Sequence, residues 1–165
     1  MNGFTEHVSG ASERGGAERL LTWGESRAML PLVGRVAKDV ISQRQHLAEL
    51  QPERDRLDGR RHHLDWPQRQ RRYQIQEEIA ACQKELRAVE AELEALGLTL
   101  LDADTGLVGF PTMVNNRQAF FSWKPDEDGL LYWNFADDTV RRPVPEDWTR
   151  PTRENTGRGR SKNRK

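Results

Sequence analysis

The chain has 165 residues and a formal net charge of zero, which fits one domain and gives no bulk preference for an acidic or a basic partner. No run approaches the ~20 apolar residues of a membrane helix, and no apolar segment near the start marks a signal peptide. A single cysteine, Cys82, excludes an internal disulfide. We therefore expect a cytoplasmic protein with no membrane partner.

Both ends of the chain have compositions that bury too little apolar surface to fold. Residues 1–20 are rich in Gly, Ser and Glu without an apolar period, and residues 149–165 contain no large apolar side chain. Residues 150–165 hold seven basic residues and one acidic residue, a charge of +6, so the remainder of the chain carries −6. We expect disordered ends, with a basic tail that either touches nucleic acid or acts as a solubilising extension.

The first helix is predicted to begin after Thr22, because Thr22 and Glu25 form the T-x-x-E pattern of a capping box. Pro31 lacks an amide hydrogen, so we expect a short helix to about Leu30, a break or kink there, and then a long helix with a second kink at Pro52. Apolar residues along the long helix alternate in steps of three and four, the heptad pattern of a packed seam. The seam positions are Val33, Val36, Val40, Gln43, Leu47, Leu50, Arg54 and Leu57.

A second helix shows the heptad pattern more cleanly, between an Asp-Trp-Pro-Gln start at residues 65–68 and Gly97, where a C-cap glycine belongs. Its seam positions are Ile75, Ile79, Cys82, Leu86, Val89, Leu93 and Leu96. The short polar connection at residues 57–67 should fold the second helix back antiparallel to the first. Residues 21–97 are thus predicted to form a long, coiled-coil-like helical hairpin.

A two-helix hairpin buries one narrow apolar stripe and is marginally stable by itself. Further apolar and small side chains lie beside the seam, where they would let another helix approach: Ile41, Ala48, Ala81, Ala88 and Ala95. We therefore expect a homodimer in which two hairpins form a four-helix arrangement. The alternative is a monomeric hairpin that is supported only by the region that follows it.

The region 98–148 changes to short apolar runs typical of strands, which predicts a small antiparallel β-meander packed on the base of the hairpin. The predicted strands are residues 98–101, 107–114, 118–123 and 130–135. Asn115-Asn116 should form the turn between the second and third strands, since Asn tolerates positive φ. Large side chains occupy both faces of the last two strands, either because both faces are packed, the commoner reason, or because one face is a ligand platform. The fold class is therefore α+β.

The segment LLDADTGLVGFP at residues 100–111 resembles the start of several metal and phosphate sites. A calcium-binding loop beginning at Asp102 would need glycine and glutamate at the positions of Leu107 and Met113. A haloacid-dehalogenase-like phosphatase would need Thr or Val in place of Gly106, and a parallel sheet with crossover helices. The triplet Asp-Thr-Gly is by itself weak evidence for an aspartic protease.

We interpret this segment as a structural turn. Asp102 and Asp104 would each accept backbone amide hydrogens, Gly106 would supply conformational freedom, and Pro111 would end the strand pairing. The adjacent histidines at residues 62–63 have no Cys pair or further ligands to complete a zinc site. We therefore expect no catalytic residue, no metal and no cofactor.

The connection between the helices is rich in arginine, with seven Arg, three Asp and two His in residues 54–72. The arginines that could meet phosphate groups are Arg60, Arg61, Arg69, Arg71 and Arg72. Trp66 or Tyr73 could stack on a nucleic-acid base. The alternative, which is the more common case, is that these arginines are solvated side chains on an exposed helical arm and bind no nucleic acid.

Four segments occur in the order LPLV at residues 30–33, GLTLLDADTGLVGFP at 97–111, FFSWK at 120–124 and LYWN at 131–134. In this order they resemble the uncharacterised bacterial family called domain of unknown function 2203, over about residues 20–143. The D-x-D-T-G-L-V-x-F-P string and the two Trp-bearing segments are the most specific parts of the likeness. The family has no established activity, so the resemblance implies architecture rather than function.

The resemblance also marks individual positions. The matching positions Asp104, Trp123 and Trp133 are implied to form a shared binding surface. Family members commonly carry Asp, Cys and His-Glu where this chain has Gly109, Ser122 and Asn134-Phe135. Any chemistry that relatives run through that Cys and His is therefore not expected in this chain.

These features favour a non-enzymatic interaction or scaffold protein that assembles through its helical hairpin and has an unidentified protein partner. The alternative is a nucleic-acid-associated factor that uses the arginine-rich hairpin tip and the basic tail. A third interpretation is a small hydrolase centred on Asp102 and Asp104, in which Asp104→Asn would abolish an activity while the fold survives.

Overall fold

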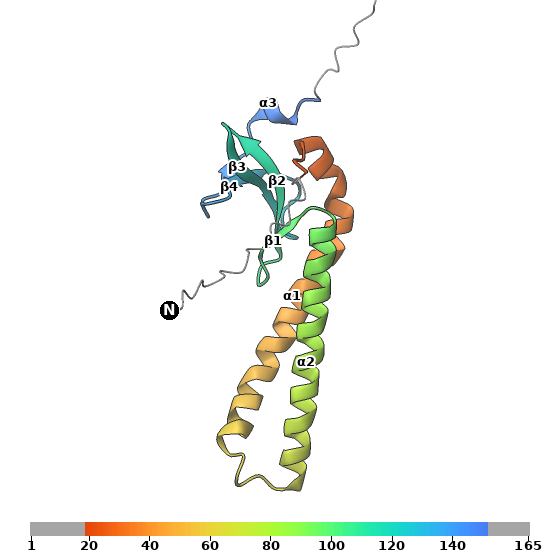
Figure 1. The fold of residues 1–165 in the computed structure, drawn as a ribbon, viewed down its shortest axis with the longest axis vertical. Coiled ribbons are helices and arrows are strands. Elements are labelled where there is room, and N and C mark those ends of the chain that lie inside the picture. Colours follow the sequence, from red (N-terminus) through yellow and green to blue (C-terminus); the bar gives the residue numbers. More distant parts are fainter. Residues whose placement is uncertain (1–18, 152–165) are drawn as a thin grey trace, which may run out of the picture.

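The computed structural model describes residues 19–151, so the expected disorder of residues 1–18 and 152–165, including most of the basic tail, lies outside the described residues. Figure 1 shows a long antiparallel helical hairpin with a small β-sheet against one end. The elements in chain order are α1 (Trp23–Gly59), α2 (Trp66–Ala95), β1 (Thr99–Asp102), β2 (Leu107–Val114), β3 (Arg117–Trp123), β4 (Tyr132–Phe135), β5 (Arg142–Pro143) and α3 (Glu146–Thr149). The predicted α+β architecture is confirmed.

Helix α1 begins at the predicted capping box. The hydroxyl of Thr22 accepts a hydrogen bond from the amide of Glu25 at 3.2 Å, and the amide of Thr22 donates to the Glu25 carboxylate at 2.9 Å. The helix continues through both Pro31 and Pro52, so of the predicted break or kink at Pro31 the break is wrong. The red start of α1 lies at an angle to the rest of the helix in Figure 1, as a kink would give. Tertiary packing offsets the roughly 3 kcal/mol cost of an interior proline, since Val33 is fully buried just beyond Pro31.

The seam between α1 and α2 is the apolar stripe that the heptads predict. One buried cluster joins both helices and their connection: Val40, Leu47, Leu50, Leu57, Leu64, Ile75, Ile79, Cys82 and Leu86. Gln43, the polar seam position, donates from its side-chain amide to Glu85 at 3.4 Å. Desolvation raises the pKa of the Cys82 thiol, so this residue behaves as a small apolar side chain in the seam.

The sheet is antiparallel, with its strands in the sequential order β1-β2-β3-β4-β5. Asn115 and Asn116 form the β2–β3 turn with φ of 51° and 58°, as predicted for a tight hairpin. The sequence did not predict β5 or α3, because a two-residue strand and a single helical turn are too short to show a hydrophobic period.

Strand β2 runs through Pro111, where its pairing was expected to end. Pro111 stays in register with Phe120 of β3, and its carbonyl accepts the Leu21 amide at 2.7 Å on the opposite edge. The N–H and C=O of one strand residue point to the same side, so the missing N–H of Pro111 faces that edge and not β3. Since β1 pairs only as far as Gly109, the proline removes no ladder hydrogen bond.

The inner face of the sheet packs on the base of the hairpin. Its core includes Val33, Ala37, Leu93, Val108, Phe110, Phe121, Trp123 and Trp133. The indole Nε1 of Trp23 donates to the Leu130 carbonyl at 2.9 Å, which ties the start of α1 to the sheet region. Within residues 19–151, no helix combines the length and the hydropathy that are needed to cross a bilayer.

Candidate functional site

The Asp-x-Asp-Thr-Gly segment forms the turn between β1 and β2. One carboxylate oxygen of Asp102 accepts the Asp104 amide at 2.9 Å, and the other accepts the Thr105 hydroxyl at 3.0 Å. These bonds hold the pKa of Asp102 below its ordinary value. Gly106 has φ of +68°, and a Cβ there would lie 2.9 Å from the Ile41 side chain, so the position requires glycine on two grounds.

Within residues 19–151, no backbone amide donates to the Asp104 carboxylate, although the sequence had suggested such a bond. That carboxylate accepts a 2.8 Å hydrogen bond from Nε of Arg44 on α1, a contact that raises the pKa of the guanidinium. Both side chains are largely exposed, so this ion pair is worth at most about 1 kcal/mol. Asp104 therefore positions the turn against the hairpin.

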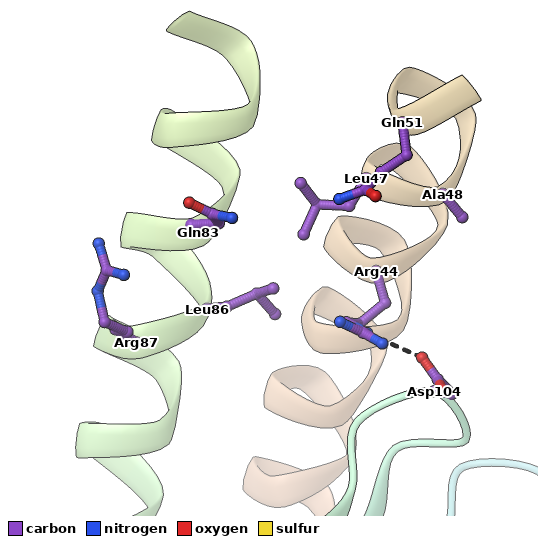
Figure 2. Close-up of a pocket in the computed structure, with 8 residues that line it drawn as sticks. All are labelled: Arg44, Leu47, Ala48, Gln51, Gln83, Leu86, Arg87 and Asp104. Carbon is purple, nitrogen blue, oxygen red and sulfur yellow. Dashed lines mark hydrogen bonds and ion pairs between the residues drawn. The ribbon is translucent and has the colours of Figure 1, made fainter. Parts of the chain in front are cut away.

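An open groove of about 670 Å³ lies between α1 and α2 beside this turn. Its lining residues are Arg44, Leu47, Ala48, Gln51, Gln83, Leu86, Arg87 and Asp104. Figure 2 shows Leu47 and Leu86 pointing toward each other from the two helices. We call this feature the interhelical groove; it combines an apolar floor with a rim that carries charges of both signs.

The two tryptophans implied to share a surface with Asp104 lie instead in the core. Trp123 is 6% exposed, and its Nε1 donates to the Glu127 carbonyl at 3.2 Å. Trp133 is 9% exposed and packs edge-on against Phe135 and at a tilt against Trp148. The structure therefore does not bring these three positions onto one exposed surface.

The arginines of the hairpin tip divide into two groups. Arg71 contacts the carboxylate of Glu53 with Nε at 3.1 Å and Nη2 at 3.0 Å, and Arg72 donates to Asp58 at 2.6 Å. The charges of Arg71 and Arg72 are thus matched by neighbouring acids. Arg60 and Arg61 are exposed, and the structure pairs neither with an acid within the described residues.

A polar network around Arg141 covers the outer face of the sheet, the face away from the hairpin. The guanidinium of Arg141 donates to the hydroxyl of Ser122 at 3.0 Å and to its carbonyl at 2.8 Å. It also forms a two-point ion pair with Glu127 at 2.6 and 2.9 Å, and lies over the ring of Tyr132. Ser122 is fully buried beneath this network.

Of the positions at which the resemblance implies other residues, Gly109, Ser122 and Asn134 are neighbours on this outer face, whereas Phe135 lies on the inner face beside Trp133. Gly109 stands directly opposite Ser122 in the register, and Asn134 lies one diagonal step away on β4. A Cβ at Gly109 would lie 2.9 Å from the Phe120 ring, so a larger side chain there does not fit without moving that ring. Sequence reasoning missed Arg141 and Glu127, because only the strand register brings them to Ser122.

The described residues 19–151 contain no group of three or more His, Cys, Asp or Glu side chains that could hold a metal ion. The fold defines an α+β protein in which a long helical hairpin projects from a five-stranded antiparallel sheet. The chain belongs to the family described as "Uncharacterized conserved protein (DUF2203)", which matches residues 19–144 and confirms the resemblance. Comparison with curated proteins and with solved structures gives no match.

Proposed function

We propose that this chain is a cytoplasmic, non-enzymatic interaction protein that assembles through its helical hairpin, with a second copy of itself as its first partner. The observation that carries this proposal is the interhelical groove. A solitary hairpin of two long helices buries only its seam, and each helix leaves the remainder of its surface to solvent or to a partner.

The chemistry of the groove supports a helical occupant. Leu47 and Leu86 form an apolar floor between the helices, and the exposed side chain of Ala48 beside them is small enough to let another helix approach closely. The rim carries Arg87 and the Arg44–Asp104 pair, so a second hairpin can present acidic and basic side chains in complementary positions.

Light scattering on purified variants tests this proposal. Ala48→Glu places a charge in the groove and should convert a dimer to a monomer. The matched control is Ala28→Glu, at an exposed position on α1 that lies 20 residues before Ala48, about 30 Å along the helix from the groove. The proposal requires that Ala28→Glu keeps the dimer mass; equal effects of the two substitutions would contradict it.

A nucleic-acid role is the second candidate, and the exposure of two aromatic rings at the tip favours it. Trp66 is 69% exposed and Tyr73 is 61% exposed, and the same tip carries Arg60 and Arg61, for which the described residues provide no acidic partner. Binding through these groups would weaken steeply with salt, because phosphate contacts release counterions. Titration of labelled RNA and DNA at low and moderate salt tests this role, with the unaltered chain, Trp66→Ala and the double variant Arg60→Ala/Arg61→Ala. If neither salt nor these substitutions change the affinity, the role is excluded.

A further inference from the structure

Helix α2 carries a second row of side chains at heptad spacing, beside its seam with α1. Gln83 and Arg87 of this row line the interhelical groove. Steps of three and four residues keep side chains on one face of a helix, and such steps extend the row toward both ends of α2. Its other members are Arg69, Tyr73, Gln76, Ala80, Glu90 and Glu94. We call this row the α2 stripe; all its side chains are at least partly exposed, so it offers a partner a continuous polar surface.

The charge of the α2 stripe changes sign along the helix. Arg69 lies near the hairpin tip, and Glu94 lies at the base, about 37 Å away at a rise of ~1.5 Å per residue. Glu90, one turn before Glu94, adds a second negative charge at the base. Within residues 19–151, neither Arg69 nor these two glutamates form an ion pair, unlike Arg71 and Arg72 beside them. The stripe therefore has an unmatched positive end and an unmatched negative end.

A second copy in antiparallel orientation complements this charge pattern. When Arg69 of one copy lies opposite Glu94 of the other, Arg87 lies opposite Gln76 in the same register, and no two like charges of the stripe face each other. Because a twofold interface uses the same surface of both copies, the contact between Arg69 and Glu94 forms twice. In the parallel orientation each residue meets its own counterpart, which sets Arg69 against Arg69 and Glu94 against Glu94.

The position of the β1–β2 turn favours the same orientation. Asp104 lines the interhelical groove and contacts Arg44 of α1, so the turn lies on the α1 side of this face and leaves the α2 stripe uncovered (Figure 2). The sheet lies at one end of the hairpin (Figure 1). Two parallel copies would bring both turns to the same end of the shared face, where they would hold the helices apart. Antiparallel copies keep the turns at opposite ends.

We propose that two copies of this chain pair antiparallel along the α2 stripe, with the tip of each hairpin against the base of the other. This inference rests on the self-assembly proposed above and adds its orientation and its charge contacts. Complementary charges at the rim of an interface determine orientation more than affinity. Arg69 and Glu94 thus select the antiparallel pair, while burial of apolar surface in the interhelical groove supplies most of the affinity.

Sedimentation equilibrium of charge-reversed variants tests the contacts. Arg69→Glu and Glu94→Arg each replace two attractive contacts per dimer by two repulsive ones, so each should weaken dimerisation about tenfold. The double variant Arg69→Glu/Glu94→Arg should restore the affinity of the unaltered chain. The matched control is Arg69→Glu/Glu92→Arg, which has the same net charge, because Glu92 is exposed about 160° around the helix from Glu94. Equal affinities of the two double variants, or single variants that dimerise like the unaltered chain, would overturn the proposal.

The distance between two spin labels measures the orientation directly. One label is attached at the exposed position of Gln70→Cys in a Cys82→Ala background, so that each copy carries a single thiol. Position 70 lies opposite position 93 of the partner in the proposed register, which sets the two labels about 35 Å apart; parallel pairing would bring them within about 20 Å. A dimer with the shorter distance would overturn the orientation alone. A monomer at every concentration of the unaltered chain would overturn both the orientation and self-assembly.

Discussion

Arg44 and Asp104 lie 60 residues apart in the sequence, and Nε of Arg44 donates to the Asp104 carboxylate at 2.8 Å. This contact joins α1 to the β1–β2 turn, next to the close approach of Gly106 to Ile41. The Asp-x-Asp-Thr-Gly turn is thus an attachment between the sheet and the hairpin.

Removal of the Arg44–Asp104 contact should cost little stability. Arg44→Gln and Asp104→Asn should each lower the free energy of unfolding by less than about 1 kcal/mol, because both side chains are exposed to water. Urea denaturation of the two single variants and the double variant measures the coupling between them. A loss of 3 kcal/mol or more for Asp104→Asn would contradict a positioning role.

Gly106→Ala should be among the most destabilising single-methyl changes in the protein. The turn holds Gly106 at φ +68°, a left-handed conformation that a Cβ disfavours, and the added Cβ would lie 2.9 Å from Cδ1 of Ile41, so we expect a loss of about 2 kcal/mol or more. The matched change Gly24→Ala lies in the first turn of α1 with no atom within 4 Å, and should be neutral or stabilising by up to about 1 kcal/mol. Thermal unfolding compares the two; a tolerated Gly106→Ala would mean that the turn can adopt another conformation.

The Asp102 carboxylate should contribute a pH-dependent part of the stability. Its pKa in the folded chain is depressed by the Asp104 amide and the Thr105 hydroxyl, so the unfolded chain takes up its proton first as pH falls. The stabilisation is present above the unfolded value of about 3.9 and is lost as pH falls through the folded value. Between about pH 5 and pH 2, the free energy of unfolding of Asp102→Asn should therefore fall less steeply than that of the unaltered chain, as measured by denaturant unfolding. Parallel curves would refute this assignment.

Disruption of the Arg141–Glu127 pair should lower the free energy of unfolding by more than disruption of an exposed ion pair does. Glu127 and Arg141 are 11% and 22% exposed, so Arg141→Met would leave a largely buried carboxylate without its partner and cost about 3 kcal/mol. Arg117→Met removes an exposed pair with Asp137 and should cost less than about 1 kcal/mol. Chemical denaturation of both variants is the measurement, and similar losses would contradict the account of the outer face.

Local patterns in the sequence predicted the main architecture. The heptads, the capping box at Thr22 and the Asn115-Asn116 turn are each encoded within a few residues, and the structure confirms all three. Of the predicted break or kink at Pro31, the break was wrong, because packing between α1 and the sheet is a long-range term that a local rule omits. Pro111 is tolerated within β2 because β1 pairs with β2 only as far as Gly109. A local rule omits this contact too, since it involves a different strand.

The candidate sites were less predictable, because they depend on contacts between distant segments. The sequence identified arginines at the tip, but not that Arg71 contacts Glu53, 18 residues earlier on the facing helix. It marked Trp133 as a surface position, and α3, which was not predicted, covers that ring with Trp148.

The central claim is assembly through the hairpin, and sedimentation equilibrium of the full chain over a wide concentration range tests it most directly. The account predicts a mass of about twice 19.0 kDa at high concentration, with reversible dissociation on dilution. A mass of 19.0 kDa at every concentration would contradict self-assembly and leave the hairpin as an arm for a different partner.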